Sequence, residues 1–378
     1  MRIPLEFNAA TLDGRREAFT QVDKHMRLCI DVDNVNQTCE TAQPAEPLLA
    51  EAAFYIIKEK HINQASELLQ VLGGPTISKG DHGELICALL WLLARDKVAQ
   101  AQGKRVIKVL DLMNALLASP WHATVKDAQP SRLKNDQDNA PFRDAFKDAV
   151  THFTQFIKVP DQQVINRSYL WMALARGAAI LRANSQSGTD IIIPILIRNT
   201  CLARNVVSAI IVQVKNGASY GANPDRLLFD LMNPYHNGFY DPDEQDTHPI
   251  IRMVFALGSK KSNVQVRQAR QSQPSRTTKT ATKFTSYDIW CAMASSETFS
   301  VIDSNETFAE LLKKEETFPR SYVYTVPEEE NRRWQMYPMA LSDLLHCRFA
   351  QAGVSVDKTV PEYIDDDMDS DDESLESV

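Results

Sequence analysis

Glycine is scarce in this chain, and long apolar runs are absent from it. Only 13 of the 378 residues are glycine, about 3% against a usual share of roughly 7%. This scarcity disfavours a β-sandwich with many tight turns and favours long helices. The longest apolar runs, 85–94 and 191–197, are shorter than the roughly 18 residues that span a bilayer. The N-terminus also lacks a run typical of a signal peptide, so we expect no membrane association.

Familiar cysteine, zinc and nucleophile motifs are missing as well. There is no CxxC, HExxH or GxSxG, and segment 73–80 lacks the Gly-Lys-Ser/Thr ending of a phosphate-binding loop. Scattered cysteines exclude a disulfide scaffold and predict reduced thiols in an intracellular protein of the nucleus or cytoplasm. The six are Cys29, Cys39, Cys87, Cys201, Cys291 and Cys347.

The charge is unevenly distributed. The formal net charge is −8, yet residues 361–378 contain nine acidic residues and no Lys or Arg. The rest of the chain is close to neutral, with 41 basic and 40 acidic residues. The negative net charge therefore comes from this C-terminal tail, which we expect to be disordered and able to bind a basic protein partner. The tail acids are Glu362, Asp365, Asp366, Asp367, Asp369, Asp371, Asp372, Glu373 and Glu376.

The opposite charge gathers in segment 259–283, which has seven basic residues and no acidic one. Its Ser, Thr and Gln content is typical of a flexible loop. Two interpretations stay open: the loop contacts the phosphates of a nucleic acid, or it is only solvated. The basic residues are Lys260, Lys261, Arg267, Arg270, Arg276, Lys279 and Lys283.

Apolar periodicity predicts helices in the first half of the chain and strands in the second. The predicted helices cover 48–72, 81–101, 106–117, 142–157, 168–184 and 338–350, and 122–142 is a polar loop. The predicted strands cover 190–197, 206–215 and 249–257, with weaker candidates at 286–294 and 299–302. Pro194 lacks an N–H group, which places the first strand at a sheet edge or a bulge.

This order of elements predicts an α/β (α+β) fold with a mixed central sheet flanked by helices. We expect three parts along the chain. They are an N-terminal extension over 1–47, an α/β domain over 48–355 and an acidic tail over 356–378. The domain would contain a large helical insertion at about 100–185 and the basic loop 259–283.

One set of residues stands out for its chemistry. Asp190 opens the first predicted strand, while Gln213 and Lys215 lie two apart on the second and so project from one face. If the two strands pair with their loop centred near 202–203, Asp190 lies opposite Lys215 and Ile192 opposite Gln213. A carboxylate, an amide oxygen and an ammonium group then converge at one end of the sheet.

Such a cluster suits metal-assisted cleavage of phosphodiesters. The Asp190 carboxylate, the Gln213 amide oxygen and the Val214 carbonyl are oxygen ligands suited to Mg²⁺, which lowers the pKa of a bound water. Lys215 can stabilise the charge that develops on phosphorus. Glu84, on the apolar helix 81–101, can add a second carboxylate.

Each of these residues also has a structural interpretation. Asp190 can be a turn residue at the start of a strand. Gln213 and Lys215 can form the exposed face of an edge strand, where Lys guards against aggregation. Asp81 and Glu84 have the spacing of a capping box.

The segments DIIIPILI (190–197) and AIIVQVKN (209–216) together resemble the D…(D/E/Q)xK signature of the restriction-endonuclease-like, or PD-(D/E)XK, nuclease superfamily. The nearest form is the QxK variant of Mrr-like restriction enzymes. The segment KGDHGELICALLWLLARD (79–96) resembles the first core helix of that fold. The same phrases also resemble fungal proteins related to Crinkler-type effectors with nuclease-like domains.

The resemblance implies a mixed sheet flanked by helices and Mg²⁺-dependent hydrolysis of DNA or RNA. Glu84, Asp190, Gln213 and Lys215 would take the four core roles. The chain departs from the signature because no Pro-Asp pair precedes the strand and Pro194 interrupts it, so a degenerate form of the enzyme stays open. The alternative from another class is a non-enzymatic interaction or effector protein that binds basic partners through its helical surface and acidic tail.

Overall fold

The computed structural model describes most of the chain up to residue 313. The described ranges are 2–5, 12–24, 27–34, 38–42, 46–72, 82–135, 138–159, 162–182, 188–198, 202–240, 247–267 and 284–313. All of them belong to one compact unit, Met1–Phe318. No helix in these ranges combines the length and the apolar character needed to cross a bilayer.

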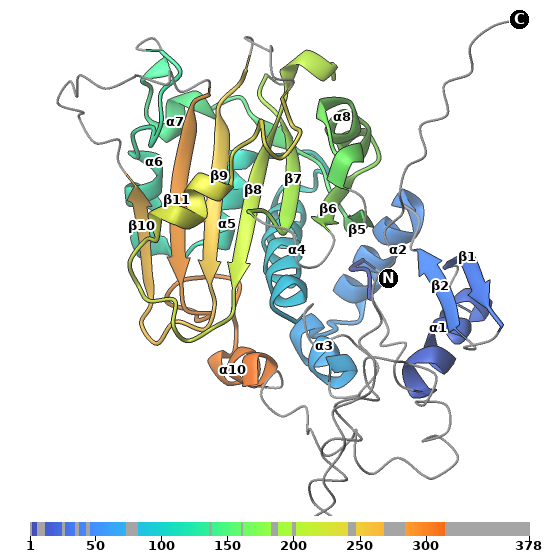
Figure 1. Ribbon diagram of the computed structural model, residues 1–378. Helices are drawn as coiled ribbons and strands as arrows, with labels where there is room; N and C mark the ends of the chain where they lie inside the picture. The colour runs from blue at the N-terminus through green and yellow to red at the C-terminus, as the bar shows by residue number, and fades with distance from the viewer. Residues whose placement is uncertain are drawn as a thin grey trace, which may run out of the picture. The chain divides into compact units, whose positions relative to one another are not determined.

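The protein has an α+β fold (Figure 1). Its α-helices are α1 (Leu12–Lys24), α2 (Pro47–Glu59), α3 (Gln64–Leu72), α4 (His82–Gln102), α5 (Val109–Leu116), α6 (His122–Lys126), α7 (Phe142–Ala145), α8 (Arg167–Ala175), α9 (Arg226–Leu231) and α10 (Asn305–Lys313). Its strands are β1 (Leu28–Asp33), β2 (Thr38–Ala42), β3 (Ile107–Lys108), β4 (Val150–Thr151), β5 (Gln155–Val159), β6 (Ala178–Arg182), β7 (Ile191–Leu196), β8 (Val207–Lys215), β9 (Ile250–Ala256), β10 (Asn263–Arg267) and β11 (Ser286–Ala292).

Within the described residues, nine strands form one mixed sheet. The main path runs β10-β11-β9-β8-β7-β4-β3, while β6 pairs with β7 and β5 pairs with β6. The strands β6, β7 and β8 are successively antiparallel, whereas β8, β9 and β11 are parallel. Parallel strands need a crossover connection, and α9 lies in the one between β8 and β9.

Helices cover both faces of this sheet, so its central strands are mainly apolar on both faces. Ile193 and Ile210 belong to the core shared with α4 and α5, which Figure 1 shows behind the sheet. Ile192 and Ile211 belong to the core shared with α8 and α9. The helix α4 is buried on nearly all sides, as its uninterrupted apolar stretch predicts.

The predicted helical insertion at about 100–185 is wrong, because this part of the chain supplies strands to the central sheet. The predicted helix 142–157 contains only α7, followed by β4 and β5. The predicted helix 168–184 ends with α8, and β6 follows. Gly177, between them, has a φ of +61°, which glycine adopts at little cost and which ends the helix. Sheet pairing here overrides the helical pattern of apolar residues.

Three smaller expectations also differ from the structure. The predicted helix 48–72 is two helices, α2 and α3, because the side chain of Asn63 accepts hydrogen bonds from the first turn of α3 and starts a new helix. The predicted loop 122–142 begins with α6. The weak strand candidate 299–302 contributes only an isolated bridge between Phe299 and Leu117.

Pro194 does not mark a sheet edge, since β7 is an inner strand. Pro194 faces Ala209 of β8. On the other side of β7, β6 pairs up to Ile192 and β4 pairs at Leu196, so Pro194 falls in the gap between them. Its carbonyl accepts a hydrogen bond from Thr151 Oγ1 at 2.8 Å across that gap. The missing N–H points to the same side, where no strand needs it.

The predicted basic loop 259–283 is in part a strand. Residues 263–267 form β10, which pairs antiparallel with β11. The segment predicted as an extension, 1–47, contains α1 and the β1–β2 hairpin. The predicted helix 338–350, the end of the predicted domain at 355 and the acidic tail 356–378 lie outside the described residues.

Candidate functional site

Three elements meet where β8 ends, namely β8 itself, the start of β7 and the first turn of α4. The predicted register of the β7–β8 hairpin is wrong by two residues: Ile192 lies opposite Ile211, not Gln213, so Asp190 is not opposite Lys215. The loop is tighter than expected because the Ile197 N–H donates to the Val206 carbonyl at 3.0 Å. A slip of two residues keeps every side chain on its predicted face.

Asp190 is tied to the backbone of β8. Its Oδ2 accepts a hydrogen bond from the Val214 N–H at 2.6 Å, and its own N–H donates to the Val212 carbonyl at 2.9 Å. Burial raises the pKa of the Asp190 carboxyl, while the Val214 N–H, Lys215 and Arg182 act to lower it. The carboxylate therefore accepts a hydrogen bond from the end of β8. It is partly removed from water, which destabilises its charged form.

Gln213 supplies an acceptor that the fold leaves unused. Its side chain is 3% exposed, and Oε1 finds no hydrogen-bond partner among the described residues. A buried polar atom without a partner is uncommon and costly. By alternation from Ile211, which packs in the core with α8 and α9, Gln213 and Lys215 project from that same face.

The Val214 carbonyl faces the Asp190 side of β8. In an extended strand the N–H and the C=O of one residue point the same way. Since the Val214 N–H is directed at the Asp190 carboxylate, its carbonyl is directed to that side as well. The Asp190 carboxylate and the Val214 carbonyl thus lie on the β7 side of β8, and the Gln213 side chain projects from one face of the same strand end.

Lys215 brings a positive charge to this end of the strand. It is half-buried, and its Nζ lies 5.8 Å from the centroid of the Tyr220 ring. Its charge lowers the pKa of Asp190, so the two groups interact. A lysine held against an aromatic face keeps its ammonium group oriented.

Glu84 comes from the helix on the opposite face of the sheet, and its first turn lies against β8. A Cβ at Gly83 would be 3.3 Å from Val214 Cγ1, so only a small residue fits there. The charges of both Asp190 and Glu84 raise the pKa of Cys87, after burial itself. Glu84 therefore lies near Asp190, but on the face of the sheet opposite the side chains of Gln213 and Lys215. Asp190, Gln213, Val214 and Lys215 are hereafter the Asp190 cluster.

Two exposed lysines lie at the same end of the sheet. The Leu257 N–H donates to the Lys215 carbonyl at 2.9 Å, and Gly258 approaches Asn216 so closely that a Cβ would stand 2.2 Å from its carbonyl oxygen. Lys260 and Lys261 follow directly in this turn and are exposed. They place positive charge beside the Asp190 cluster.

The other basic residues predicted to contact phosphate differ from Lys260 and Lys261. Arg267 is held inside the fold, with its Nη1 3.5 Å from Asp288 Oδ2, which argues against its binding phosphate. The remaining four, Arg270, Arg276, Lys279 and Lys283, lie outside the described residues.

Sequence reasoning missed Arg182 and Tyr220. Arg182 is buried at the end of β6, donates to Asn237 Oδ1 at 2.5 Å and interacts with the charge of Asp190. It was hidden because residues 178–182 were assigned to a helix, where an arginine after an apolar run attracts no notice. Tyr220 sits in the loop after β8, and no spacing links it to Lys215.

The donor set fits a hard cation better than a soft one. Within the described ranges, no group of three or more His, Cys, Asp and Glu residues could hold a metal ion. A site at the Asp190 cluster therefore depends on amide and carbonyl oxygens beside one carboxylate, which are ligands typical of Mg²⁺ and Ca²⁺. The partnerless Gln213 Oε1 is the observation that favours such an ion.

A second buried ionic group lies on the same sheet. Arg252 of β9 and Asp288 of β11 are paired in register and fully buried, with Arg252 Nε 2.7 Å from Oδ1 and Nη2 2.6 Å from Oδ2. Ser286 Oγ also donates to Oδ1 at 3.0 Å, and Arg252 Nη1 donates to the Phe229 carbonyl at 2.6 Å. These charges are satisfied within the fold.

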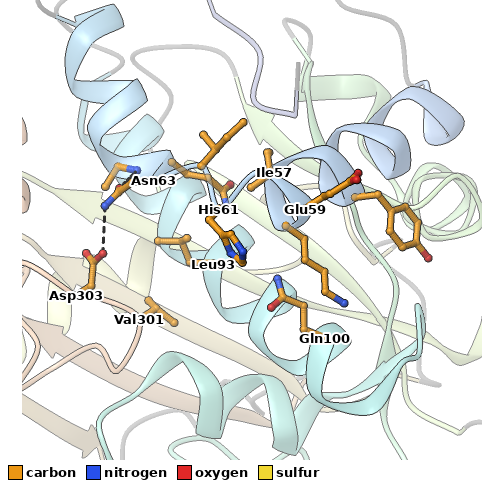
Figure 2. A pocket seen from close by; sticks show the side chains of 13 residues that line it. Ile57, Glu59, His61, Asn63, Leu93, Gln100, Val301 and Asp303 are labelled. Atoms are coloured by element: carbon orange, nitrogen blue, oxygen red, sulfur yellow. Dashed lines mark hydrogen bonds between the residues drawn. The ribbon is translucent and has the colours of Figure 1, made fainter.

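A groove of about 860 Å³ lies elsewhere, between the end of α2, the start of α3, α4 and the segment before α10 (Figure 2). Asn63 Nδ2 donates to Asp303 Oδ2 across it at 3.3 Å. The lining mixes apolar residues such as Leu93 with Lys58 and His61. No residue of the Asp190 cluster lines it, and its mixed chemistry indicates no single class of ligand.

Comparison with known proteins gives one match. A family model described as "Domain of unknown function (DUF8736)" matches residues 15–313, and this range ends where α10 ends. No curated protein and no solved structure resembles the chain at a significant level. Because the match covers most of the sequence, the chain belongs to the DUF8736 family.

Proposed function

We propose that the Asp190 cluster is the active site of a metal-dependent nuclease that hydrolyses phosphodiester bonds of DNA or RNA. The observation that carries the proposal is the buried Gln213 Oε1, which lacks a hydrogen-bond partner among the described residues. It lies on the strand that also carries Lys215, next to a carboxylate whose burial raises its pKa. Buried polar atoms that serve only the fold usually have a hydrogen-bond partner.

The resemblance of residues 190–197 and 209–216 to the D…QxK signature supports the same proposal independently of the geometry. So does the mixed sheet with helices on both faces. In this view Asp190 is held in place by the Val214 N–H, so that its position at the end of β8 is fixed before any ligand arrives. A preorganised carboxylate of this kind loses little freedom on binding.

The chain's residues would share the work as follows. The Asp190 carboxylate, the Gln213 amide oxygen and the Val214 carbonyl hold a Mg²⁺ or Mn²⁺ ion, with Glu84 of α4 near Asp190. Such an ion, when bound, supplies a Lewis acid and lowers the pKa of a coordinated water. Lys215, oriented by Tyr220, stabilises the negative charge that develops on the phosphate oxygens.

Lys260 and Lys261 would receive the nucleic acid. They are exposed and follow the C-terminal end of β9, which lies beside the C-terminal end of β8. A phosphate backbone that reaches the Asp190 cluster would therefore pass close to them. Contacts of this kind add affinity without reading sequence.

The direct test is cleavage of plasmid DNA, single-stranded DNA and RNA with Mg²⁺ or Mn²⁺. The wild type should cleave at least one of them, and Lys215→Ala should be slower by about 10²–10³-fold. Lys104→Ala, which removes an exposed lysine after α4, is the matched control and should cleave like the wild type. If the wild type cleaves none of the substrates, or Lys215→Ala cleaves equally fast, the proposal is wrong.

The alternative, a non-enzymatic protein that binds basic partners, rests on the acidic tail, which lies outside the described residues. It predicts binding to basic proteins that is lost when residues 361–378 are deleted and that needs no metal ion. No described contact favours it over the nuclease.

A further inference from the structure

The β1–β2 hairpin, distant in sequence from the Asp190 cluster, brings two thiols together. Cys29 lies on β1 and Cys39 on β2, and the Cys39 thiol donates to Cys29 Sγ with 3.6 Å between the sulfurs. Neither cysteine forms a disulfide, and Cys29 is exposed. Among the cysteines that the structure describes, Cys87 and Cys291 are buried, belong to the core and lack this access.

We propose that Cys29 and Cys39 form a reversible disulfide when a peroxide oxidises the protein. The β1–β2 hairpin is then a site of reversible thiol oxidation. The sulfurs need to approach by about 1.5 Å to reach the bond length of roughly 2.05 Å. Two features of β1 make this movement cheap. Its ladder to β2 is irregular between Cys29 and Asp31, and its residues Leu28–Val32 are exposed, so no core packing holds them in place.

The environment also sets the order in which the sulfurs react. Burial, the hydrogen bond to Cys29 and the charges of Cys29 and Asp31 raise the pKa of Cys39 to about 11, although Arg27 acts to lower it. Cys39 therefore keeps its proton and donates it toward Cys29. The exposed Cys29 sulfur, which accepts that hydrogen bond, is the one that a peroxide in solution can reach.

The chemistry balances with hydrogen peroxide as the oxidant. The Cys29 thiolate attacks one peroxide oxygen, an S–O bond forms, the O–O bond breaks and hydroxide leaves to become water, which gives a sulfenic acid. The Cys39 sulfur then attacks the Cys29 sulfur, so that an S–S bond forms and the S–O bond breaks. The departing hydroxide takes the Cys39 proton as a second water. Two thiols are oxidised and one peroxide is reduced.

The cross-link would act on an element that needs support. A two-stranded sheet is marginally stable by itself. Arg27 ties this one to the chain before it, since it donates to Thr41 Oγ1 at 2.9 Å and to the Leu5 carbonyl at 2.8 Å. A disulfide between β1 and β2 would hold the two strands together and so restrict the opening of the hairpin.

The test uses the full chain, treated with hydrogen peroxide and then with iodoacetamide, and mapped by mass spectrometry of unreduced peptides. We expect a peptide pair linked through Cys29 and Cys39, the loss of two reactive thiols, and full recovery of both with dithiothreitol. Cys87→Ser, which removes a buried thiol, should give the same linkage.

Two variants keep the proposal falsifiable. In Cys39→Ser, Cys29 should stop at the sulfenic acid or oxidise further, because its resolving partner is missing. In Cys29→Ser, Cys39 should stay reduced over the same time. A wild-type product in which Cys29 is sulfinic acid, or is linked only to a second chain, would overturn the proposal. So would equal oxidation of Cys39 in the presence and absence of Cys29.

Discussion

Two carboxylates at the central sheet, the fully buried Asp288 and the half-buried Asp190, have opposite surroundings. Asp288 is fully buried, and both of its oxygens receive a donor from Arg252, with Ser286 and Arg267 adding further contacts. Asp190 has one backbone donor, from Val214, beside an amide oxygen of Gln213 that has no partner among the described residues. Both oxygens of the Asp288 carboxylate accept hydrogen bonds from Arg252, whereas the Gln213 amide oxygen accepts none from the described residues.

This difference separates charges that serve the fold from charges that await a ligand. A buried ion pair is tolerated when every oxygen and N–H is satisfied. A buried acceptor without a donor lowers stability, and proteins keep such groups mainly where they act on something else. On this reasoning the Arg252–Asp288 pair is structural, and the Asp190 cluster is where a cation and a phosphate fit.

The largest effect should follow from breaking the Arg252–Asp288 pair. Asp288→Ala leaves Arg252 buried without its counter-charge, and we expect the free energy of unfolding to fall by about 3–5 kcal/mol. Urea denaturation followed by circular dichroism measures it. A double variant, Asp288→Leu with Arg252→Met, is the control and should recover much of the loss, because no unpaired charge is left. A loss below about 1 kcal/mol in the single variant contradicts the structural role.

The opposite sign is expected at Gln213. Gln213→Met keeps the length of the side chain but removes the partnerless oxygen, so stability should stay the same or rise by about 1 kcal/mol. The same denaturation experiment measures it. Metal-dependent cleavage should nevertheless be lost. A variant that is both less stable and fully active would show that the Gln213 amide serves the fold.

Asp190→Asn should also keep or raise the stability of the folded protein, by an amount that depends on pH. Because the pKa of Asp190 is raised in the folded protein, folding becomes less favourable as pH rises from the ordinary value of 3.8 through the raised pKa, and that loss is complete above it. Asparagine cannot ionise, yet its oxygen can still accept from the Val214 N–H. The variant's relative stability should therefore increase across this window and then stay constant.

Unfolding curves of the wild type and Asp190→Asn, recorded from pH 3 upward, measure this difference. A stability difference that falls as pH rises would mean that ionised Asp190 stabilises the fold.

The smallest change should come from the surface. Removing both lysines in Lys260→Ala/Lys261→Ala should leave stability unchanged and reduce the dependence of nucleic-acid binding on salt, by about one unit of slope per lost phosphate contact. Fluorescence anisotropy with labelled DNA at several salt concentrations measures it. An unchanged slope would place the nucleic acid elsewhere on the protein.

The sequence predicted the strands next to the candidate site, and the faces on which their side chains lie, better than the rest of the sheet. Strands β7, β8 and β9 are apolar segments with several β-branched residues, which predicted their existence. The shared face of Gln213 and Lys215 followed from the alternation of side chains along a strand. The register did not follow, because the hydrogen bond from Ile197 to Val206 that tightens the loop leaves no mark in composition.

The region 100–185 was mispredicted for a different reason. Its short apolar pieces, such as 178–182, fit a helix as well as a strand, and only pairing with distant residues decides between them. Both β6 and β4 pair with β7, which follows them in the chain. Contacts of this kind, like the approach of Gly83 to Val214, are set by the tertiary fold and cannot be predicted from local patterns.

The central claim is that Asp190 and Gln213 hold a divalent cation, and a Mn²⁺ titration followed by electron paramagnetic resonance tests it most directly. We predict that the wild type binds Mn²⁺, that Mg²⁺ competes, and that Asp190→Asn and Gln213→Met lose this binding while staying folded. Lys104→Ala should bind like the wild type. A wild type that binds no Mn²⁺, or variants that bind it unchanged, would contradict the account.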